Sequence, residues 1–505
     1  MSSDNTTTES ATDLDVLIVG AGISGIGAAC HLVREGTGLS YAILERRDAV
    51  GGTWDLFRYP GIRSDSDMLT FGFNFRPWVG TKVLADGPSI RQYVADTAEE
   101  HGVTEHIRFG RQVTKASWST EEGRWTVEVR VGRKRETYTS RFLVGATGYY
   151  SYDQAYRPSF PGEERFQGQL VHPQFWPEDL DHAGKKVVVI GSGATAITLV
   201  PAMAPEAEHV TMLQRSPSYV MTVPADDPVA SPLARLGVPQ GLIYRTGRVR
   251  NIALQAAVYK LSRSRPALAR KVLLAAVRRQ IGPGVDMKHF TPSYDPWDER
   301  LCVVPNGDLF RVLRRGDASI VTDHIDTFTE TGIRLASGEE LEADIVVSAT
   351  GLQIQLAGGA RIEVDGQPVE TRERMLYKGV LMEGVPNAVF VIGYTNASWT
   401  LKADLVSEYF CRLVKHMAAA GHDQVVAVAD PDDRDDVSVM GDSMRSGYIQ
   451  RGDAVMPRQG KRLPWRIRND YLRDAPMLRR GQIADPALQF RSTKRAAAQA
   501  PISVR

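Results

Sequence analysis

The sequence has little cysteine, with three residues of this type among 505. Cys30, Cys302 and Cys411 lie far apart in the chain and form no CxxC pair. Disulfide scaffolds, zinc ribbons and dithiol redox centres all need closely spaced cysteines, so each of them is disfavoured. We therefore predict no metal site and no redox-active disulfide.

An excess of charge of either sign is also lacking. The chain has 61 Lys and Arg against 60 Asp and Glu, a formal net charge of +1. This balance argues against a nucleic-acid partner, although a balanced total can hide a local patch. With 43% hydrophobic and 24% charged residues, the composition is that of a globular protein, and the length predicts about three domains.

Long hydrophobic runs without interruption are scarce as well. Two stretches, Val16–Val33 and Val187–Pro205, contain no Asp, Glu, Lys or Arg and approach the length of a membrane span. Each contains glycines, however, and follows the order β-branched strand, glycine turn and helix. Acidic residues precede the first stretch, which therefore lacks the positive flank of a secretory signal. We interpret both stretches as nucleotide-binding units and predict a cytoplasmic protein.

The two stretches open two copies of one β-turn-α-β pattern. Residues 15–20 are nearly continuous in aliphatic residues, as is typical of a buried strand in a parallel sheet. Helical spacing over residues 23–33 and a second strand over residues 41–45 complete the first copy. The second copy comprises a strand over 185–190, a helix over 194–204 and a strand over 209–215.

Two further predicted strands share one ending. Residues 142–148 and 345–351 are aliphatic runs that both finish in Ala-Thr-Gly, which places a tight glycine turn after each strand. Together with the two β-turn-α-β copies, they predict an α/β fold with two dinucleotide-binding units.

The first glycine motif, GAGISG at residues 20–25, has the chemistry of a dinucleotide site. Gly20 allows a sharp turn, Gly22 lets the backbone approach a pyrophosphate, and Gly25 permits close packing of helix on strand. The phosphate charge then meets the unpaired N–H groups at the start of the helix. Glu45 ends the second strand, where a carboxylate accepts ribose hydroxyls and repels a 2′-phosphate, so the motif predicts FAD or NAD.

The second motif, GSGATA at residues 191–196, has alanine in place of the third glycine. Its second strand ends without an acid, in Gln-Arg-Ser at residues 214–216. An arginine at the ribose end suits a 2′-phosphate, which indicates NADP, although a surface ion pair is an alternative for this side chain. The residues that we assign to this cofactor are Gly191, Gly193, Ala194, Thr195, Arg215 and Ser216.

One site for FAD and one for NADPH imply hydride transfer onto a flavin. The electrons then need an acceptor, and the missing CxxC pair excludes a dithiol. Oxygen, a quinone or another protein remains.

Residues 228–285 differ from the rest of the chain, because they hold eleven basic residues and no acid. Aliphatic residues recur there at helical spacing, for example Leu268, Val272, Leu273 and Val277. The pattern predicts an inserted helical subdomain with a solvated basic face over a packed aliphatic face. Contact with an anionic membrane and attraction of an anionic cofactor are the alternatives.

Two long segments carry a family resemblance. Residues 166–177, FQGQLVHPQFWP, match FxGxxxHxxxWP, and residues 51–65 match GGxWxxxxYPGxxxD. On these segments the chain resembles the type I (class B) Baeyer–Villiger flavin monooxygenases. Three more segments, RYPGIRSDSDM, DPWDERLCVVPNGDLFR and GYTNASWTLKADLVSE, are similar to members of this family that oxidise thioamides.

The resemblance implies roles for individual residues. Arg300 matches the arginine that stabilises the oxygen adduct of the flavin, and Asp65 matches the acid that orients it. The stretch Ser64-Asp65-Ser66-Asp67 offers two carboxylates, of which the motif spacing selects Asp65. A structural salt bridge with Asp298 or Glu299 is the alternative for Arg300. The resemblance places four residues near the flavin, Gly52, Thr53, Trp54 and Tyr59; two in a linker that couples NADP position to the flavin state, His172 and Trp176; and two at the border of substrate or flavin, Trp399 and Thr400.

The resemblance also implies a fold of two Rossmann-like domains, each interrupted in sequence. The FAD-binding domain joins residues 1–150 to 352–505, which include a loose tail from 492. The NADP-binding domain joins residues 165–225 to 300–351, and the helical insertion occupies 226–299.

The implied activity is that of an NADPH- and O₂-dependent monooxygenase. In this family NADPH reduces FAD, O₂ adds at flavin C4a, and the peroxide converts a ketone into an ester or lactone; sulfides and thioamides are oxidised as well. Three alternatives stay open: an S- or N-oxygenating flavin monooxygenase with little ketone activity, a nucleotide-binding sensor, and a membrane-bound dehydrogenase that reduces quinone. The resemblance leaves the oligomeric state and the native substrate open.

Overall fold

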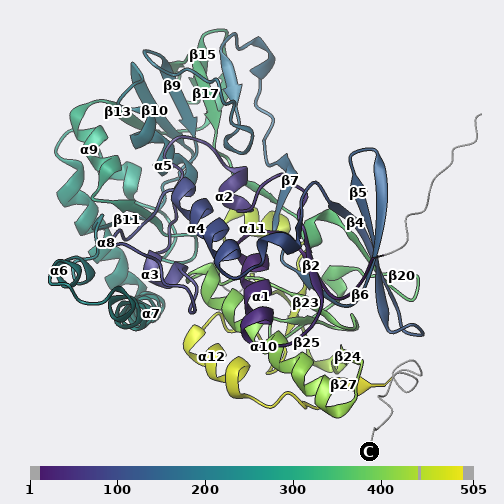
Figure 1. Cartoon of the computed structure of the whole chain (residues 1–505). Helices are drawn as coiled ribbons and strands as arrows, with labels where there is room; N and C mark the ends of the chain where they lie inside the picture. The colour runs from purple at the N-terminus through teal and green to yellow at the C-terminus, as the bar shows by residue number, and fades with distance from the viewer. Residues whose placement is uncertain (1–11, 442–444, 493–505) are drawn as a thin grey trace, which may run out of the picture.

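The structure is a computed structural model that describes residues 12–441 and 445–492. It contains a larger sheet-based unit, a smaller one and a group of helices at one edge (Figure 1). The tail predicted from residue 492 lies, beyond Ser492, outside the described residues. Among the described helices, none combines the length and low polarity that crossing a membrane requires.

The larger unit is built on a sheet of eleven strands within the described residues. At its centre, β1 pairs in parallel with both β2 and β6. Val16 and Ile18 face one hydrophobic cluster and Leu17 faces another, so this part of β1 is buried on both faces. Helix α1 packs between this sheet and α10. The strands of this sheet are β1 (Thr12–Val19), β2 (Tyr41–Leu44), β3 (Ile107–Arg108), β4 (Gln112–Ser119), β5 (Arg124–Val131), β6 (Lys134–Gly145), β19 (Arg361–Val364), β20 (Gln367–Pro368), β21 (Leu376–Tyr377), β22 (Leu381–Met382) and β23 (Ala388–Phe390).

The smaller unit has a parallel sheet of five described strands, in the order β13-β10-β9-β17-β8. Its core is a separate hydrophobic cluster that includes most of α5 and α9. The strands of this sheet are β8 (Gln169–Val171), β9 (Lys186–Ile190), β10 (His209–Gln214), β13 (Ala318–Thr322) and β17 (Ile345–Ser348).

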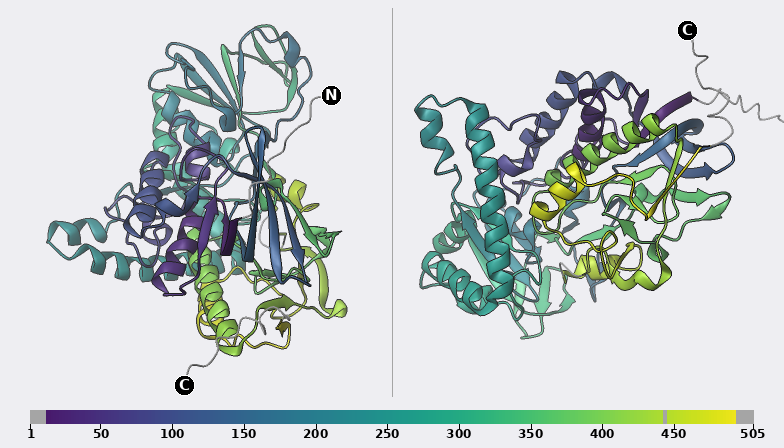
Figure 2. Two further views of the ribbon diagram at one scale, coloured as in Figure 1. Left: turned by 45° about the vertical axis from the view of Figure 1, so that its right-hand side comes forward. Right: turned by 90° about the horizontal axis from the view of Figure 1, so that it is seen from below.

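Short strand pairs and helices connect and cover the two sheets (Figure 2). The remaining strands are β7 (Tyr150–Ala155), β11 (Val220–Val223), β12 (Cys302–Pro305), β14 (Ile325–Phe328), β15 (Gly332–Leu335), β16 (Glu340–Glu342), β18 (Leu352–Ile354), β24 (Gln424–Ala427), β25 (Arg434–Ser438), β26 (Arg458–Gly460) and β27 (Leu488–Arg491). The α-helices are α1 (Ile23–Arg34), α2 (Thr53–Leu56), α3 (Met68–Phe71), α4 (Gly87–Glu100), α5 (Ala194–Met203), α6 (Ala230–Arg235), α7 (Gln240–Ser264), α8 (Pro266–Ile281), α9 (Asp308–Arg315), α10 (Trp399–Ala420), α11 (Gly447–Gly452) and α12 (Tyr471–Arg480).

The predicted α/β fold and both β-turn-α-β copies are confirmed, as β1-α1-β2 and β9-α5-β10. Each unit also draws strands from two separate stretches of chain: residues 12–145 and 361–390 for the larger sheet, and 169–214 and 318–348 for the smaller. The interrupted order follows from this pairing, while the exact domain limits stay a prediction.

The inserted segment is helical, as predicted, and forms α6, α7 and α8. Its expected packed aliphatic face is only partly present. Val277 is buried, but Leu268 and Val272 are 51% and 59% exposed. The helical spacing is present, but none of the elements in residues 12–441 and 445–492 covers this part of α8, so spacing alone predicted burial wrongly at these two positions.

Gly25 lies where α1 crosses the end of β1. A Cβ atom at this position would lie 1.8 Å from the carbonyl oxygen of Gly20. No side chain fits at such a distance, so the close approach of helix and strand requires glycine here.

We expect Gly25→Ala to destabilise the chain by about 1–3 kcal/mol, the usual cost of overpacking. The matched control is Gly241→Ala near the start of α7, where a Cβ meets nothing within 4 Å. This control is expected to melt at or slightly above the wild-type temperature, because alanine favours helix. Thermal unfolding followed by circular dichroism measures both, and equal melting of Gly25→Ala and wild type would contradict the packing argument.

Candidate active site

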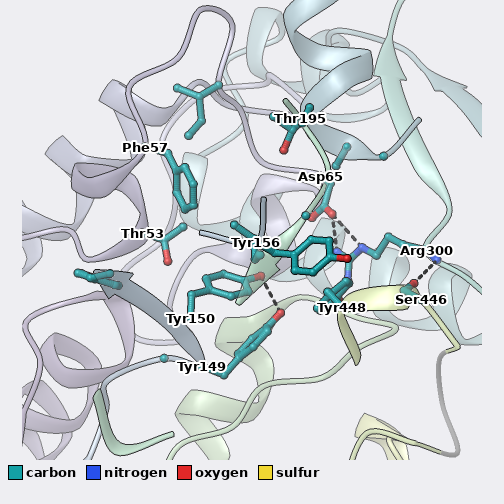
Figure 3. Close-up of a pocket in the computed structure, with 18 of the residues that line it drawn as sticks. Thr53, Phe57, Asp65, Tyr149, Tyr150, Tyr156, Thr195, Arg300, Ser446 and Tyr448 are labelled. Carbon is teal, nitrogen blue, oxygen red and sulfur yellow. Dashed lines mark hydrogen bonds and ion pairs between the residues drawn. The ribbon is translucent and has the colours of Figure 1, made fainter. Parts of the chain in front are cut away.

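A single cavity of about 860 Å³ brings the two glycine motifs together. Figure 3 shows part of its wall, where side chains from both units point toward one another. Of the residues expected at the site, four do not line the cavity: Gly25, His172, Trp176 and Thr400. Those that do are Gly20, Gly22, Glu45, Gly52, Thr53, Trp54, Tyr59, Asp65, Gly191, Gly193, Ala194, Thr195, Arg215, Ser216, Arg300 and Trp399.

Both glycine motifs pack against the Ala-Thr-Gly turns that the sequence repeats. Gly20 has a φ of +105°, and a Cβ there would lie 2.7 Å from the carbonyl oxygen of Ala146. Gly191 has a φ of +139°, and its Cβ would lie 2.5 Å from the carbonyl oxygen of Ala349. The same close contact between the first glycine and a turn carbonyl therefore occurs in both units. In each unit it leaves no room for a side chain at that glycine.

The starts of α1 and α5 fit the pyrophosphate groups of two dinucleotides. Each helix begins after a glycine in extended conformation, Gly22 or Gly193, with no side-chain cap on its first N–H groups. A Cβ at Gly193 would meet nothing within 4 Å, so open space lies over the start of α5. Free N–H groups and the helix dipole favour a phosphate at both places.

Glu45 is buried at the end of β2, on the cavity wall. One carboxylate oxygen accepts the N–H of Ala21 at 2.7 Å, and the other accepts the N–H of Arg47 at 2.8 Å. Burial raises the pKa of Glu45, while these two hydrogen bonds act in the opposite direction. Each oxygen keeps a second lone pair, so the carboxylate can accept ribose hydroxyls from a fixed position.

Arg300 and Asp65 form an ion pair in the cavity wall (Figure 3). The Arg300 Nε and Nη2 groups donate to Asp65 Oδ2 at 2.9 and 2.5 Å, and Nη1 donates to the carbonyl oxygen of Thr395 at 2.9 Å. Burial lowers the pKa of Arg300, but the Asp65 charge and hydrogen bond together with the neighbouring Tyr448 and Tyr149 outweigh it, and the net shift is upward. The guanidinium therefore keeps its charge and a fixed plane. The alternative ion pairs with Asp298 and Glu299 do not form; Asp298 pairs with Arg263 instead.

Asp67 has a different set of contacts from Asp65. It caps α3 by accepting the N–H of Thr70 at 3.1 Å. It also accepts the side-chain amides of Asn251, at 2.7 Å, and Gln255, both on α7. The contact with Arg300 belongs to Asp65, while Asp67 ties the same loop to the inserted helices.

Helix α7 reaches the segment before Arg300 as well. Tyr259 packs edge-on against Trp297, with ring centroids 5.3 Å apart, and Arg263 pairs with Asp298 at 2.7 Å. With Asn251 and Gln255, these residues recur every fourth position, which places them along one side of the helix. One side of α7 thus braces both segments that carry the ion pair.

Three tyrosines beside the ion pair were not assigned from the sequence. Tyr150 donates to the hydroxyl oxygen of Tyr149 at 2.8 Å, and Tyr149 also hydrogen-bonds with Tyr448. Burial raises the pKa of all three hydroxyls, so they remain protonated donors. Tyr149 and Tyr150 directly follow the first Ala-Thr-Gly turn, a signal that could have found them; Tyr448, on α11, had no such signal.

Aromatic side chains from distant segments close the wall near the first glycine motif. Trp399 stacks on Tyr149, with ring centroids 5.2 Å apart, and donates its Nε1–H to Ser24 Oγ at 2.7 Å. Trp54 packs edge-on against Phe71. Thr400, expected beside Trp399 at the site, is fully buried and does not line the cavity.

One of the assigned residues, Tyr59, connects the two units. It packs against the hydrophobic core of the smaller unit, and burial raises its pKa to about 12. Arg215, at the end of β10, is exposed to the cavity with Ser216. Arg215 makes no ion pair within residues 12–441 and 445–492, so the surface ion pair considered for it is not formed.

The linker residues lie outside the cavity wall. His172 Nδ1 accepts the N–H of Gln174 at 3.1 Å and so caps a short 3₁₀ turn. Burial lowers the pKa of His172. Trp176 packs at the edge of the smaller unit's core. These contacts suit a structural role in the linker.

Comparisons with known proteins agree with this arrangement. A family model described as flavin-binding monooxygenase-like matches residues 84–419, and one for an NAD(P)-binding Rossmann-like domain matches residues 18–80. MymA of Mycobacterium tuberculosis is 56% identical over 94% of this chain and 97% of its own length. The FAD-containing monooxygenase EthA of the same organism is 52% identical, again over 94% and 97%.

Solved structures share the fold. An oxidized steroid monooxygenase bound to NADP aligns with a TM-score of 0.74 and 23% identity, over 95% of this chain and 100% of that one. The cyclohexanone monooxygenase from Rhodococcus sp. Phi1 bound to NADP⁺ aligns with a TM-score of 0.73 and 22% identity, over 96% and 100%.

The different contacts of Asp65 and Asp67 predict different effects on stability. We expect Asp67→Ala to cost about 1 kcal/mol for the lost helix cap, and more for the released α7 amides. Asp65→Asn keeps a hydrogen-bond acceptor for Arg300 and is expected to melt within about 1 °C of the wild type. Thermal unfolding of the FAD-loaded variants measures both. Equal destabilisation by the two substitutions would assign Asp65 a structural role.

Proposed function

The chain belongs to the flavin-binding monooxygenase-like family and is an FAD-dependent monooxygenase; on that premise, we propose that it converts ketones into esters or lactones. The balanced reaction takes ketone, O₂, NADPH and a proton to ester, water and NADP⁺. The observation that carries the proposal is the Arg300–Asp65 pair, which lies in one cavity with both dinucleotide motifs. We further propose that the same cavity oxidises sulfides and thioamides, and that the protein acts in the cytoplasm.

The two cofactors take opposite sides of the cavity in this proposal. FAD belongs to the larger unit, residues 1–150 and 352–505, and NADP to the smaller one, residues 165–225 and 300–351. The glycine-capped starts of α1 and α5 would hold the two pyrophosphates. The residues around FAD are Gly20, Gly22, Glu45, Gly52, Thr53, Trp54, Tyr59 and Asp65, with Gly25 packing α1 against β1 behind them, and those around NADP are Gly191, Gly193, Ala194, Thr195, Arg215 and Ser216.

FAD, when bound and reduced by NADPH, would activate O₂, which supplies the oxygen atom that is transferred. Arg300 contributes a permanent positive charge at the cavity wall, which stabilises negative charge that develops on oxygen there. Asp65 and the carbonyl of Thr395 hold the plane of the guanidinium, so that little reorganisation is needed during the reaction. Arg300 and Asp65 are therefore our catalytic assignments.

The aromatic wall has a second task in the proposal, the exclusion of water. Trp399 and Tyr149 stack, and Tyr150 lies against Tyr149 with its hydroxyl engaged. A dry wall strengthens the field of Arg300 and limits loss of the activated oxygen to water.

We expect Arg300→Ala to retain FAD and its reduction by NADPH, but to lose ester formation by about 100-fold or more, the usual cost of an oxyanion-stabilising donor. A double variant, Arg300→Ala with Asp65→Asn, controls for the charge left on Asp65. Stopped-flow absorbance follows flavin reduction, and gas chromatography of products from a linear ketone and a thioether follows oxygen transfer.

Unchanged ester yield in Arg300→Ala would remove Arg300 from the mechanism. A wild-type protein that yields sulfoxide and no ester would support the alternative activity, S-oxygenation without ketone conversion. Reduction of quinone without oxygenated product would instead support the dehydrogenase.

We expect Arg215→Ala to raise KM for NADPH by about tenfold and to leave KM for NADH nearly unchanged, because only NADPH has a 2′-phosphate to pair with the guanidinium. Arg133→Ala is the matched control, since Arg133 is exposed and does not line the cavity. Initial rates of NADPH and NADH oxidation give both constants. Equal effects on the two coenzymes would mean that Arg215 does not meet the phosphate.

A further inference from the structure

Exposed large hydrophobic residues are concentrated on the inserted helices. The structure identifies sixteen large hydrophobic residues as exposed in its described part, and nine of these lie between Val229 and Val272. Monomeric proteins scatter such residues singly, and a concentration of them marks an interaction site. In Figure 1 these helices, α6 to α8, lie together at the lower left edge, and the left view of Figure 2 shows teal helices standing out from the rest.

The exposed apolar residues form stripes on either side of the joint between α7 and α8. Leu254, Val258 and Leu261 follow one another at intervals of four and three on α7, which places them along one side of the helix. Leu268 and Val272 are four apart on α8. Arg265 forms the joint between the two helices. We call these five apolar residues, with the exposed cations described next, the insertion surface.

The eleven cations of residues 228–285 fall into two groups. Five have partners that hold them: Arg248 with Asp404, Arg250 with Asp227, Lys260 with Asp470, Arg263 with Asp298, and Arg270 with the Tyr219 hydroxyl. The other six are exposed and make no ion pair with any residue in 12–441 or 445–492: Arg235, Arg245, Arg265, Lys271, Arg278 and Arg279. With no acid between residues 228 and 285, the charge of these six is not compensated by any acid on α6, α7 or α8.

The position of these cations argues against a role in attracting the anionic cofactors. No basic residue of the insertion lines the described cavity. The attraction of an anionic cofactor, which the sequence left open, therefore has no support from the cavity wall.

A second copy of this chain is also a poor occupant of the insertion surface. A symmetric contact would bring two sets of uncompensated cations together, and like charges across an interface cost several kcal/mol. A nucleic acid would meet aliphatic side chains, whereas nucleic-acid sites use aromatic stacking beside their cations.

We propose that the insertion surface docks onto a lipid bilayer that contains anionic headgroups. Aliphatic side chains among Lys and Arg at helical spacing are what such a bilayer surface binds: the apolar side chains enter the headgroup boundary, and the cations meet the phosphates. Both components are present on α7 and α8, and at the joint between these helices Arg265 and Lys271 adjoin Leu261 and Leu268. The inference does not depend on which substrate the cavity takes.

The test is co-sedimentation of the full-length, FAD-loaded protein with vesicles. We expect binding to phosphatidylcholine vesicles that contain about 30% phosphatidylglycerol, at least tenfold weaker binding to phosphatidylcholine alone, and loss of most binding in about 0.5 M salt, where charges are screened.

Two sets of variants separate the two components of the surface. Arg265→Glu with Lys271→Glu should weaken binding to the anionic vesicles at least tenfold. Leu254→Ser with Leu268→Ser should weaken it severalfold with no change in charge. The matched control is Arg133→Glu with Lys134→Glu, two exposed cations at the turn between β5 and β6, which should bind as the wild type does. Flavin absorbance and thermal unfolding verify that each variant is folded.

Three results would overturn the proposal. The wild type fails to sediment with anionic vesicles. The control pair weakens binding as much as the charge variant, so that only total charge matters. Analytical ultracentrifugation shows a dimer that Leu254→Ser with Leu268→Ser dissociates, so that the surface is an interface between copies.

Discussion

The ion pair between Arg300 and Asp65 is the interaction on which the rest of the site depends. Asp65 comes from the loop before α3, Arg300 from the segment before β12, and the carbonyl that fixes the guanidinium comes from Thr395, just before α10. The pair therefore exists only when three segments far apart in sequence meet. Because the same cavity carries both glycine motifs, the positive charge lies within reach of chemistry at either dinucleotide site.

The dinucleotide motifs of the two units share one local backbone arrangement. In each, the first glycine of the motif crosses a carbonyl of an Ala-Thr-Gly turn, at Ala146 in one unit and Ala349 in the other. The difference between them lies at the end of the second strand. Buried Glu45 ends β2, whereas exposed Arg215 follows β10. A carboxylate there repels a 2′-phosphate and a guanidinium attracts one, so we propose that this one position distinguishes the two sites.

Sequence patterns predicted what depends on neighbouring residues. The strands and helices around both glycine motifs follow from local periodicity, and the need for Gly25 follows from the motif itself. Asp65 and Asp67 are two residues apart and chemically identical, so only tertiary contacts separate the one that meets Arg300 from the one that caps α3. Tyr448 was missed because its partners, Tyr149 and Arg300, come from distant segments. Leu268 and Val272 have the spacing of a packed face, but periodicity cannot tell whether a partner is present.

Helix α7 has two sides with different neighbours. One side holds Asp67 through Asn251 and Gln255, and it holds the segment before Arg300 through Tyr259 and Arg263. Another side carries Leu254, Val258 and Leu261 into solvent. Both sets of residues therefore belong to one continuous helix. A shift of α7 at its exposed stripe would displace its contacts with the loop of Asp65 and with the segment before Arg300 at the same time.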